Sequence, residues 1–319
     1  MSIGLEDIKS KIADIMYASD VKEKIIEHYN GIQETGIDTG FFPLNGHFSW
    51  LPGDVTVFGG IAGHGKSTLA MYLSVLKSSA HDNKWVFFSP ENNPPQYFYE
   101  ELMFMYLRCF PRSKYVNEAG FTRAFNFVNE HYFFCYPENE PPTPGLIHDR
   151  FDKCFMDYGV KGFVTDPFNQ LERDMMKSQR DDQYLSAYLS DAKRYAMAKE
   201  GDYIIVTHPD KASVGRKKDS IDRECPDEYC MAGGAMWPNK VDNIIIVHRP
   251  VKSSCPDSTE VLINIAKIKK HRIVGRPGRI IVFFNKYKNI FEESDETFGG
   301  AAQDNSELMR VDNNSENPF

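Results

Sequence analysis

The chain has 319 residues, of which 41% are hydrophobic and 26% charged, a balance that allows one large or two small domains. No apolar run approaches the roughly 18 residues that a membrane span needs, and the start MSIGLEDIKS lacks the core of a signal peptide. The six cysteines follow no regular spacing, which favours reduced thiols over a disulfide framework. We therefore expect a cytoplasmic protein with no membrane partner.

The formal net charge of −8 is unevenly distributed along the chain. Residues 209–290 carry sixteen Lys and Arg against nine Asp and Glu, whereas residues 291–319 carry eight acids against one basic residue. A basic segment followed by an acidic tail favours a polyanion site, with a tail that shields it or docks on a basic partner. The alternative is that both segments are solvated surface.

The predicted elements begin with residues 5–30, whose apolar side chains have helical spacing and end at Gly31. Downstream, apolar strands alternate with stretches of helical periodicity. Strands are expected at 55–60, 84–92, 131–137, 162–166 and 203–208. Helices are expected at 66–80, 95–130, 146–158 and 181–199. Three closely spaced strands then follow at 243–249, 260–268 and 278–284.

This alternation predicts an α/β fold in which helices cover both faces of a mainly parallel, twisted sheet. The short connections between the last three strands predict an antiparallel addition at its C-terminal side. Apolar residues become scarce after Glu292, so the end of the chain is expected to be disordered. We expect three segments: a helical arm at 1–34, a folded core at 35–293 and an acidic tail at 294–319.

Residues 60–67, GIAGHGKS, match the phosphate-loop pattern G-x-x-x-x-G-K-[ST] between a predicted strand and a predicted helix. The glycines allow backbone N–H groups to converge on phosphate oxygens, and the helix N-terminus adds its dipole. Lys66 is expected to reach the β- and γ-phosphates, and the Ser67 hydroxyl to bind Mg²⁺. The sequence therefore predicts a site for ATP or another nucleoside triphosphate. Its expected contacts are Gly60, Gly63, His64, Gly65, Lys66, Ser67 and Thr68.

Three further polar residues follow predicted strands. Asp166 is expected to bind Mg²⁺ through water, unless it only caps the turn that follows. Glu91 is placed to polarise an attacking water, with Glu172 as a weaker candidate for this role. His208 could contact the γ-phosphate, although a histidine at the end of a strand is often structural.

A glutamate on the strand after the phosphate-loop helix is typical of RecA-like ATPases, and several co-linear motifs narrow the resemblance. HPDKAS, CMAGGAMWPNKVDNIIIVHRP, FFSPEN, DPFNQLE and DDQYLSAYLSDAKRYA resemble the DnaB-like hexameric replicative helicases, particularly the Twinkle-like members and the phage primase-helicases. The resemblance covers about residues 35–290. It implies a RecA-like phosphate-loop NTPase core that forms a hexameric or similar ring and translocates 5′→3′ on single-stranded DNA by NTP hydrolysis.

The resemblance also implies roles for single residues. Glu91 would be the catalytic base, Asp166 the magnesium-linked acid and His208 the phosphate sensor. KHRIVGRPG, residues 270–278, matches the family's K-x-R-x-x-G-x-x-G pattern. Lys270 and Arg272 would therefore reach the γ-phosphate bound by the neighbouring subunit, with a plain DNA contact as the alternative use of this basic stretch.

The resemblance also implies nucleotide contacts and DNA contacts in other segments. Arg249 and Phe284 are expected at the nucleotide, Phe284 by stacking on the base, unless its ring belongs to the core. AGGAMWPNKVD matches the glycine turn and polar side chain that couple nucleotide to DNA, with Asn where many members have Gln. The polar stretch before it is suited to a loop that binds the DNA backbone. The expected DNA contacts are Lys211, Arg216, Lys217, Lys218, Gly233, Gly234 and Asn239.

The chain departs from the family at its N-terminus, which shows neither a primase or zinc-ribbon domain nor the collar domain of bacterial DnaB. Arm 1–34 resembles only the linker helix that packs on the next subunit. A separate primase, polymerase or loader is therefore an expected partner, and the resemblance leaves open a phage-encoded protein acting in the host cytoplasm.

Two other functions compete with a helicase. One is a RecA-like recombinase or repair ATPase that forms filaments on DNA. It is disfavoured because no clear N-terminal polymerisation motif is found and because the motifs at 232–242 and 270–278 match helicases. The other is a nucleotide-gated scaffold without productive hydrolysis, which Glu91 and Arg272 disfavour.

Overall fold

The structure is a computed structural model that describes residues 15–32, 35–173, 180–210, 213–218 and 220–294. The chain divides into two compact units, Met1–Thr35 and Gly36–Phe319. The first unit contains the 3-10 helix η1 (Ala18–Val21) and the helix α1 (Lys22–Tyr29). Of the helix expected over residues 5–30, the described residues form an α-helix only at Lys22–Tyr29. An Asp20 carboxylate that accepts from the Tyr17 backbone N–H at 2.9 Å closes a separate turn before it.

The second unit is built on a nine-stranded sheet with the order β3-β2-β4-β5-β1-β6-β7-β8-β9. The strands from β3 to β6 in this order are parallel, whereas β7, β8 and β9 are antiparallel to their neighbours. This confirms the predicted parallel sheet with an antiparallel C-terminal addition, but β6, expected to be the first strand of that addition, is parallel to β1 and belongs to the parallel part. The strands are β1 (Val55–Gly59), β2 (Trp85–Phe88), β3 (Tyr132–Cys135), β4 (Gly162–Thr165), β5 (Asp202–Thr207), β6 (Asn243–His248), β7 (Glu260–Ile268), β8 (Gly278–Asn285) and β9 (Ile290–Glu292).

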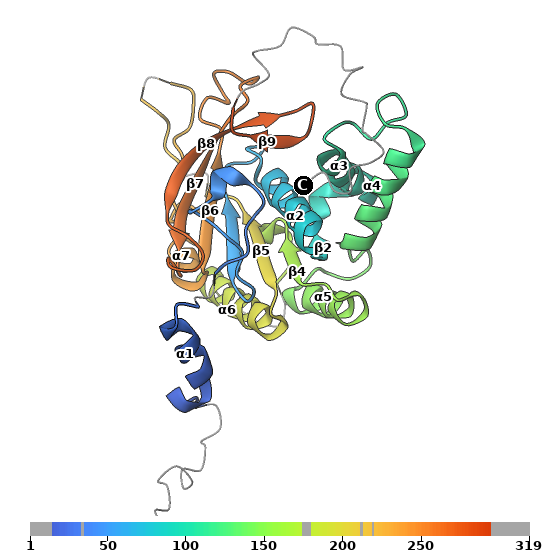
Figure 1. The fold of residues 1–319 in the computed structure, drawn as a ribbon. Helices are drawn as coiled ribbons and strands as arrows, with labels where there is room; N and C mark the ends of the chain where they lie inside the picture. The colour runs from blue at the N-terminus through green and yellow to red at the C-terminus, as the bar shows by residue number, and fades with distance from the viewer. Residues whose placement is uncertain (1–14, 33–34, 174–179, 211–212, 219, 295–319) are drawn as a thin grey trace, which may run out of the picture. The chain divides into compact units, whose positions relative to one another are not determined.

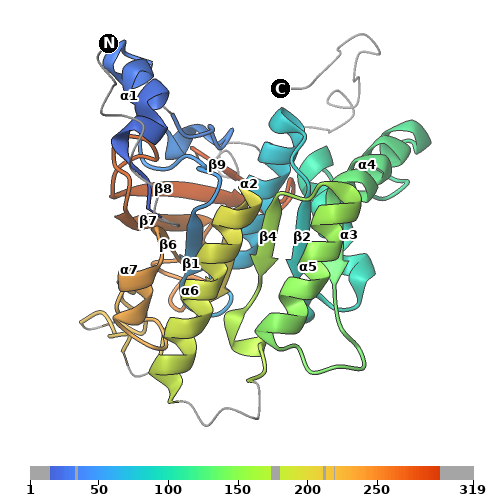
Figure 2. The same ribbon diagram turned by 90° about the horizontal axis from the view of Figure 1, so that it is seen from below.

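Helices cover both faces of this sheet (Figure 1). One face is covered by α2 (Lys66–His81), α3 (Pro95–Leu107) and α4 (Glu118–His131). The other is covered by α5 (Pro144–Tyr158), α6 (Asp181–Lys199) and the short α7 (Met236–Lys240), as Figure 2 shows from below. Along β1, Phe58 packs on the α2 side, and Val55 and Val57 pack on the α6 side. Because successive side chains of a strand point to opposite faces of the sheet, the buried strands contribute to two hydrophobic cores, one on each face.

Some elements differ from the predicted ones. The single helix expected at 95–130 is two helices, because Arg108 has a left-handed φ of 54° and Pro111 follows it. Asn117 then caps α4 by accepting from the Gly120 N–H at 2.8 Å. Neither α7 nor β9 was predicted, since elements of five and three residues are too short for periodicity to detect. The predicted tail lies outside the described residues, and the division at 34/35 and 293/294 stays a prediction.

The sheet places the site residues at its two ends. β1 lies between β5 and β6, with Gly59 opposite Thr207 and Ile246. Residues that follow the parallel strands therefore meet at one end, which we call the carboxyl edge. The opposite end, where the parallel strands begin, we call the amino edge. β7 runs antiparallel to β6, with Ile268 opposite Asn243 at the start of β6, so the residues after β7 lie at the amino edge. Within the described residues, no helix is both long and apolar enough to cross a bilayer.

Candidate nucleotide-binding site

The loop between β1 and α2 has the backbone conformation that its glycines allow. Gly60, Gly63 and Gly65 have φ angles of 143°, 69° and 93°. A Cβ on Gly60 would also lie only 2.2 Å from the Val247 carbonyl oxygen on β6. Gly60 is thus required both by its dihedral angle and by the close approach of the neighbouring strand.

Lys66 begins α2 and is almost fully buried, with its Nζ donating to the Ile61 carbonyl at 3.1 Å. Next to it, the Ser67 hydroxyl donates to Asp166 Oδ1 at 2.9 Å. Burial lowers the pKa of Lys66 to about 8, although the nearby charges of Asp166 and Glu91 oppose this shift. Burial likewise raises the pKa of Asp166 to about 6, and Glu91 adds to the rise. The site therefore holds ionisable groups whose charges water does not fully stabilise.

The Ser67 and Asp166 oxygens fit a magnesium ion. Both are hard donors, and an adjacent cation would balance the buried Asp166 carboxylate, which is only 2% exposed. Among the described residues there is no group of three or more His, Cys, Asp or Glu side chains that could hold a metal. Mg²⁺ does not require one, since it commonly binds one or two protein oxygens together with water and phosphates.

Glu91 and His208 reach the same edge from β2 and β5. Glu91 lies in the short helix η3 (Pro90–Asn92), is exposed, and raises the pKa of Lys66, Asp166 and His208 by its charge. Burial lowers the pKa of His208, and the Lys66 charge acts in the same direction. His208 Nδ1 is buried and has no hydrogen-bond partner in the described part of the chain. The structure thus brings the predicted acid, base and sensor together beside Lys66.

Ser89 is a site residue that sequence reasoning missed. It is the first residue after β2, is fully buried, and its hydroxyl points to Asp166 Oδ2 at 3.4 Å. The Asn92 side chain donates to the same hydroxyl oxygen at 2.8 Å. The sequence signal that could have identified Ser89 is its position directly after an apolar strand, β2, which pairs with β4, the strand before Asp166.

Two of the side chains expected around the rest of the nucleotide, His64 and Arg249, are hydrogen-bonded within the protein. The His64 ring accepts the Arg249 backbone N–H at 2.9 Å, so it faces the end of β6. The Arg249 guanidinium donates to the carbonyls of Pro256 and Ser258. Thr68 is half-buried in the first turn of α2. The expected nucleotide contacts of these three side chains stay predictions.

Phe284 lies on β8 and is half-buried, with its ring centroid 5.3 Å from that of Phe291 on β9. Phe291 in turn lies against the phosphate loop, because its Cζ would be 3.8 Å from a Cβ on Gly65. The antiparallel addition thus packs against the start of α2. Phe284 belongs to the core at least in part, and its stacking on a base stays a prediction.

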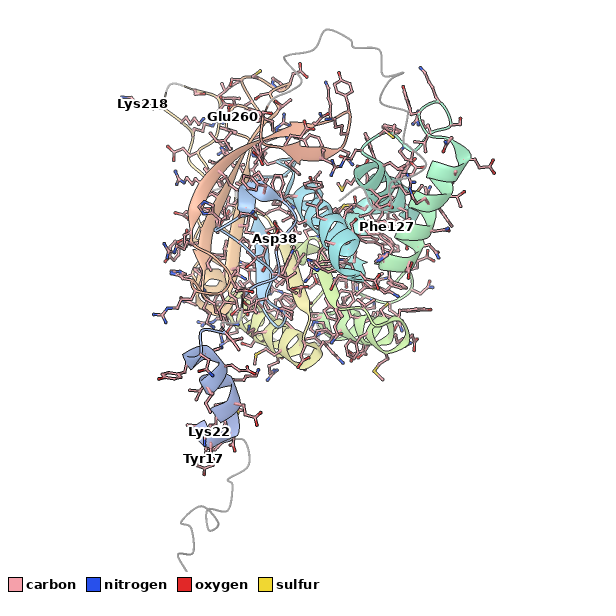
Figure 3. The ribbon with its side chains drawn as sticks, viewed as in Figure 1. Tyr17, Lys22, Asp38, Phe127, Lys218 and Glu260 are labelled. Atoms are coloured by element: carbon pink, nitrogen blue, oxygen red, sulfur yellow. The ribbon has the colours of Figure 1, made fainter. Side chains whose placement is uncertain are left out.

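The segment after β5 folds back onto the carboxyl edge. Pro209 and Met231 form an antiparallel bridge at its base. Lys217, one of the expected DNA contacts, donates its Nζ to the Pro250 carbonyl at 2.7 Å. Arg216 is exposed, and Lys218 is exposed at the outer end of its loop in Figure 3. Lys211 lies outside the described residues.

The glycine turn after this segment is hydrogen-bonded directly to His208, the predicted sensor. The Ala232 N–H donates to the His208 carbonyl at 3.4 Å, and the Trp237 indole donates to the Ala232 carbonyl at 2.7 Å. Gly233 has a φ of 99°, and a Cβ there would lie 2.2 Å from the Leu185 side chain, so the turn requires glycine. Gly234 follows with a φ of 55°.

Asn239 is not brought to the phosphate loop. It is exposed on α7, the helix that leads to the start of β6. Asn243 at that start pairs with Thr56 near the beginning of β1, and the phosphate loop follows the other end of β1. The segment connects the two edges of the sheet, and only its first residues lie beside His208.

Lys270 and Arg272 also lie at the amino edge. Lys270 Nζ donates to Asp54 Oδ1 at 2.8 Å, directly before β1. Arg272 is exposed and lines a 330 Å³ cavity together with His271, Asp38 and other residues. The five residues of β1, about 16 Å long, separate this edge from the phosphate loop. Neither cation is therefore placed to act on a nucleotide held by the same chain.

No protein-family model matches this chain. The chain is 25% identical over 277 residues to the Twinkle homolog protein, chloroplastic/mitochondrial, of Arabidopsis thaliana, a match that covers 83% of this chain. The chain spans only 38% of the length of that relative.

Solved structures give a similar result. The ATPase domain of G40P matches with a TM-score of 0.70 and 14% identity, covering 88% of this chain and all of that domain. A DnaB-like replicative helicase, solved for its interactions with primase, matches with a TM-score of 0.66 and 14% identity. That match covers 90% of this chain and 69% of the helicase chain. The fold is thus the one seen in the ATPase domain of G40P and in this DnaB-like helicase, and the predicted resemblance to DnaB-like and Twinkle-like proteins is confirmed.

Proposed function

We propose that this chain is the motor of a replicative DNA helicase. It binds ATP or another nucleoside triphosphate with Mg²⁺ and uses hydrolysis to translocate on single-stranded DNA, 5′→3′ by resemblance, as a hexameric or similar ring. The observation that carries the proposal is the separation of the site into two parts. Lys66, Asp166, Glu91 and His208 meet at the carboxyl edge, whereas Arg272 lies at the amino edge.

In this proposal the carboxyl edge performs the chemistry. Lys66 and the loop N–H groups would bind the phosphates, and Ser67 and Asp166 would hold Mg²⁺, whose charge would neutralise that of the phosphate oxygens. Glu91 is exposed toward solvent and accepts a proton from the attacking water. The free Nδ1 of His208 bonds to the γ-phosphate.

DNA binding is proposed for the segment attached to His208. The exposed cations Arg216 and Lys218 and the backbone of the Gly233–Gly234 turn would bind DNA phosphates without reading sequence. The hydrogen bond between the His208 carbonyl and Ala232 transmits a change at the γ-phosphate to this turn. Lys217 takes part only if it releases the Pro250 carbonyl.

Completion of the site requires a second copy of the chain. Arg272, with Lys270 beside it, would stabilise the transferring phosphoryl group bound by a neighbour, an effect of roughly 10³–10⁵ in rate for such arginines. An isolated subunit should then bind nucleotide but hydrolyse it very slowly. A separate primase, polymerase or loader is proposed as a further partner, since a structural relative is described with primase. Action in the cytoplasm and phage origin stay predictions, because the Arabidopsis relative is named as organellar.

The two-part site can be tested by mixing two inactive variants. Lys66→Ala destroys the carboxyl-edge half, and Arg272→Ala destroys the amino-edge half. Mixed before assembly on single-stranded DNA, they should regain partial hydrolysis, because some junctions combine an intact phosphate loop with an intact Arg272. A mixture of Lys66→Ala with Glu91→Gln damages the same half twice and should stay inactive. Wild-type turnover by Arg272→Ala alone, or no recovery in the first mixture, would contradict the shared site.

A forked substrate distinguishes the helicase from the two alternatives. Unwinding that depends on NTP and on a 5′ single-stranded tail supports the proposal. Strand exchange by filaments without unwinding would favour a recombinase. Negligible NTP turnover with DNA present would favour a scaffold.

A further inference from the structure

The loop between β6 and β7 places a lysine on the phosphate loop. Lys252 Nζ donates to the Gly63 carbonyl oxygen, although the two residues are 189 positions apart. A Cβ on Gly63 would lie 2.6 Å from this nitrogen, so the ammonium group lies directly on the loop backbone. Its charge reaches the site as well. It contributes to the lowered pKa of Lys66 and of His64, for both of which burial is the larger cause.

The position of Lys252 is held by a buried carboxylate from another segment. Asp222 is 4% exposed, and its Oδ1 accepts the backbone N–H groups of Ser253 at 2.9 Å and Ser254 at 3.0 Å. Its Oδ2 accepts the hydroxyls of Ser254 and Ser220. These bonds, that of the Ser254 hydroxyl first, lower the pKa of Asp222, so the carboxylate is ionised at neutral pH. Asp222 thus fixes the two residues that directly follow Lys252.

A second bond holds the other side of the same loop. Lys217 Nζ donates to the carbonyl of Pro250, which lies two residues before Lys252. The backbone N–H of Lys217 donates to the Asp222 carbonyl at 3.0 Å. Lys252 therefore has a fixed approach to the phosphate loop, which a lysine on an unattached surface loop would lack.

We propose that Lys252 is a second phosphate-binding cation of the nucleotide site and that Asp222 is its positioning residue. The proposal rests on the proposed binding of a nucleoside triphosphate at Gly60–Ser67. An ammonium group has three donors, so Lys252 can keep its bond to the Gly63 carbonyl and donate a second one to a phosphate oxygen. Lys66 and Lys252 then contact the anionic phosphates from two elements, α2 and the β6–β7 loop.

The test measures the affinity of the full chain for fluorescent ADP and a fluorescent non-hydrolysable ATP analogue, with Mg²⁺ and without DNA. Lys252→Met should weaken binding about tenfold, since a charge-assisted hydrogen bond is lost. Lys252→Arg should retain most of the affinity. Lys153→Met makes the same change at an exposed position on α5 and should bind like the wild type. Lys252→Met with wild-type affinity overturns the proposal.

The positioning role needs a double-mutant cycle. Asp222→Ala should weaken nucleotide binding in the wild type but cause no further loss in the Lys252→Met background, because it acts through that lysine. An equal loss in both backgrounds shows a general structural role and overturns the positioning of Lys252 by Asp222. Asp222→Asn, which keeps the side-chain shape, replaces Asp222→Ala if the latter does not fold.

The parent proposal is tested by Lys66→Ala under the same conditions. If Lys66→Ala loses affinity while Lys252→Met does not, the nucleotide site is correct and only the second cation is wrong. If neither variant loses affinity, the nucleotide site itself is wrong.

Discussion

Asp166→Asn is expected to stabilise the fold at neutral pH while abolishing Mg²⁺-dependent hydrolysis. The Asp166 carboxyl is 2% exposed, and its pKa is raised from 3.8 to about 6, first of all by burial. A raised pKa means that the folded chain holds the proton more tightly than the unfolded chain. The stability that this group contributes is therefore fully present below about pH 3.8 and is lost as the pH rises through about 6.

The magnitude follows from the shift. A rise from 3.8 to about 6, at 1.36 kcal/mol per pKa unit, makes the ionised carboxylate cost about 3 kcal/mol of folding free energy above pH 6. Asparagine removes the charge and keeps the shape. Its carbonyl can accept from the Ser67 hydroxyl, and its amide can donate to the Ser89 hydroxyl oxygen. We expect a gain of about 1–3 kcal/mol at pH 7.5 that declines toward zero as the pH approaches 4.

Urea unfolding at pH 7.5 and pH 5 measures this gain. Trp50, Trp85 and Trp237 are all at most 1% exposed, so their fluorescence reports loss of both cores. Asp157→Asn, at an exposed position on α5, is the matched control and should change little at either pH. A variant at Asp166 that is less stable than the wild type at pH 7.5, or equally stabilised at both pH values, would refute the reasoning.

Three further outcomes are expected. Lys66→Ala should reduce phosphate release to background, because alanine cannot hold the transferring phosphate, and wild-type turnover would exclude this site. Deletion of 294–319 should leave NTP hydrolysis intact and affect at most a partner contact, whereas loss of basal hydrolysis would show that the tail belongs to the fold. Phe151→Ala removes a fully buried ring between α5 and β5 and should destabilise the chain by about 3–5 kcal/mol in urea, so a loss below about 1 kcal/mol would contradict the packing.

The fold was predictable wherever periodicity and length agree. Buried parallel strands such as β1 and β5 are continuous apolar runs, and α6 is long and ended by polar residues, so each was found within a few positions. The break at Arg108 was missed because a left-handed residue leaves no periodic signal, although Pro111 inside the expected helix was a readable one. The short α7 and β9 depend on packing against larger elements and not on their own propensity.

Some residues of the candidate site could likewise be predicted from sequence patterns, and others could not. Asp166, Glu91 and His208 were found because each follows an apolar strand, and parallel strands end at a common edge. Lys252 and Asp222 were missed because neither stands at a strand end or within a motif. Lys252 meets Gly63 only because β6 lies beside β1 in the sheet, and that strand order is not encoded in any local spacing.

The position of Lys270 and Arg272 at the amino edge has a consequence for symmetry. In a two-fold dimer, residue i of one copy contacts residue j of the other and the reverse, so both shared sites would close within the pair and no Arg272 would remain for a third copy. A heterologous, head-to-tail contact also joins the carboxyl edge of one copy to the amino edge of the next, but it leaves one half of a site free at each end until a ring closes. An assembly built on head-to-tail contacts would be polar, whether it closes into a ring or stays open, and all its subunits would face the same way along its axis.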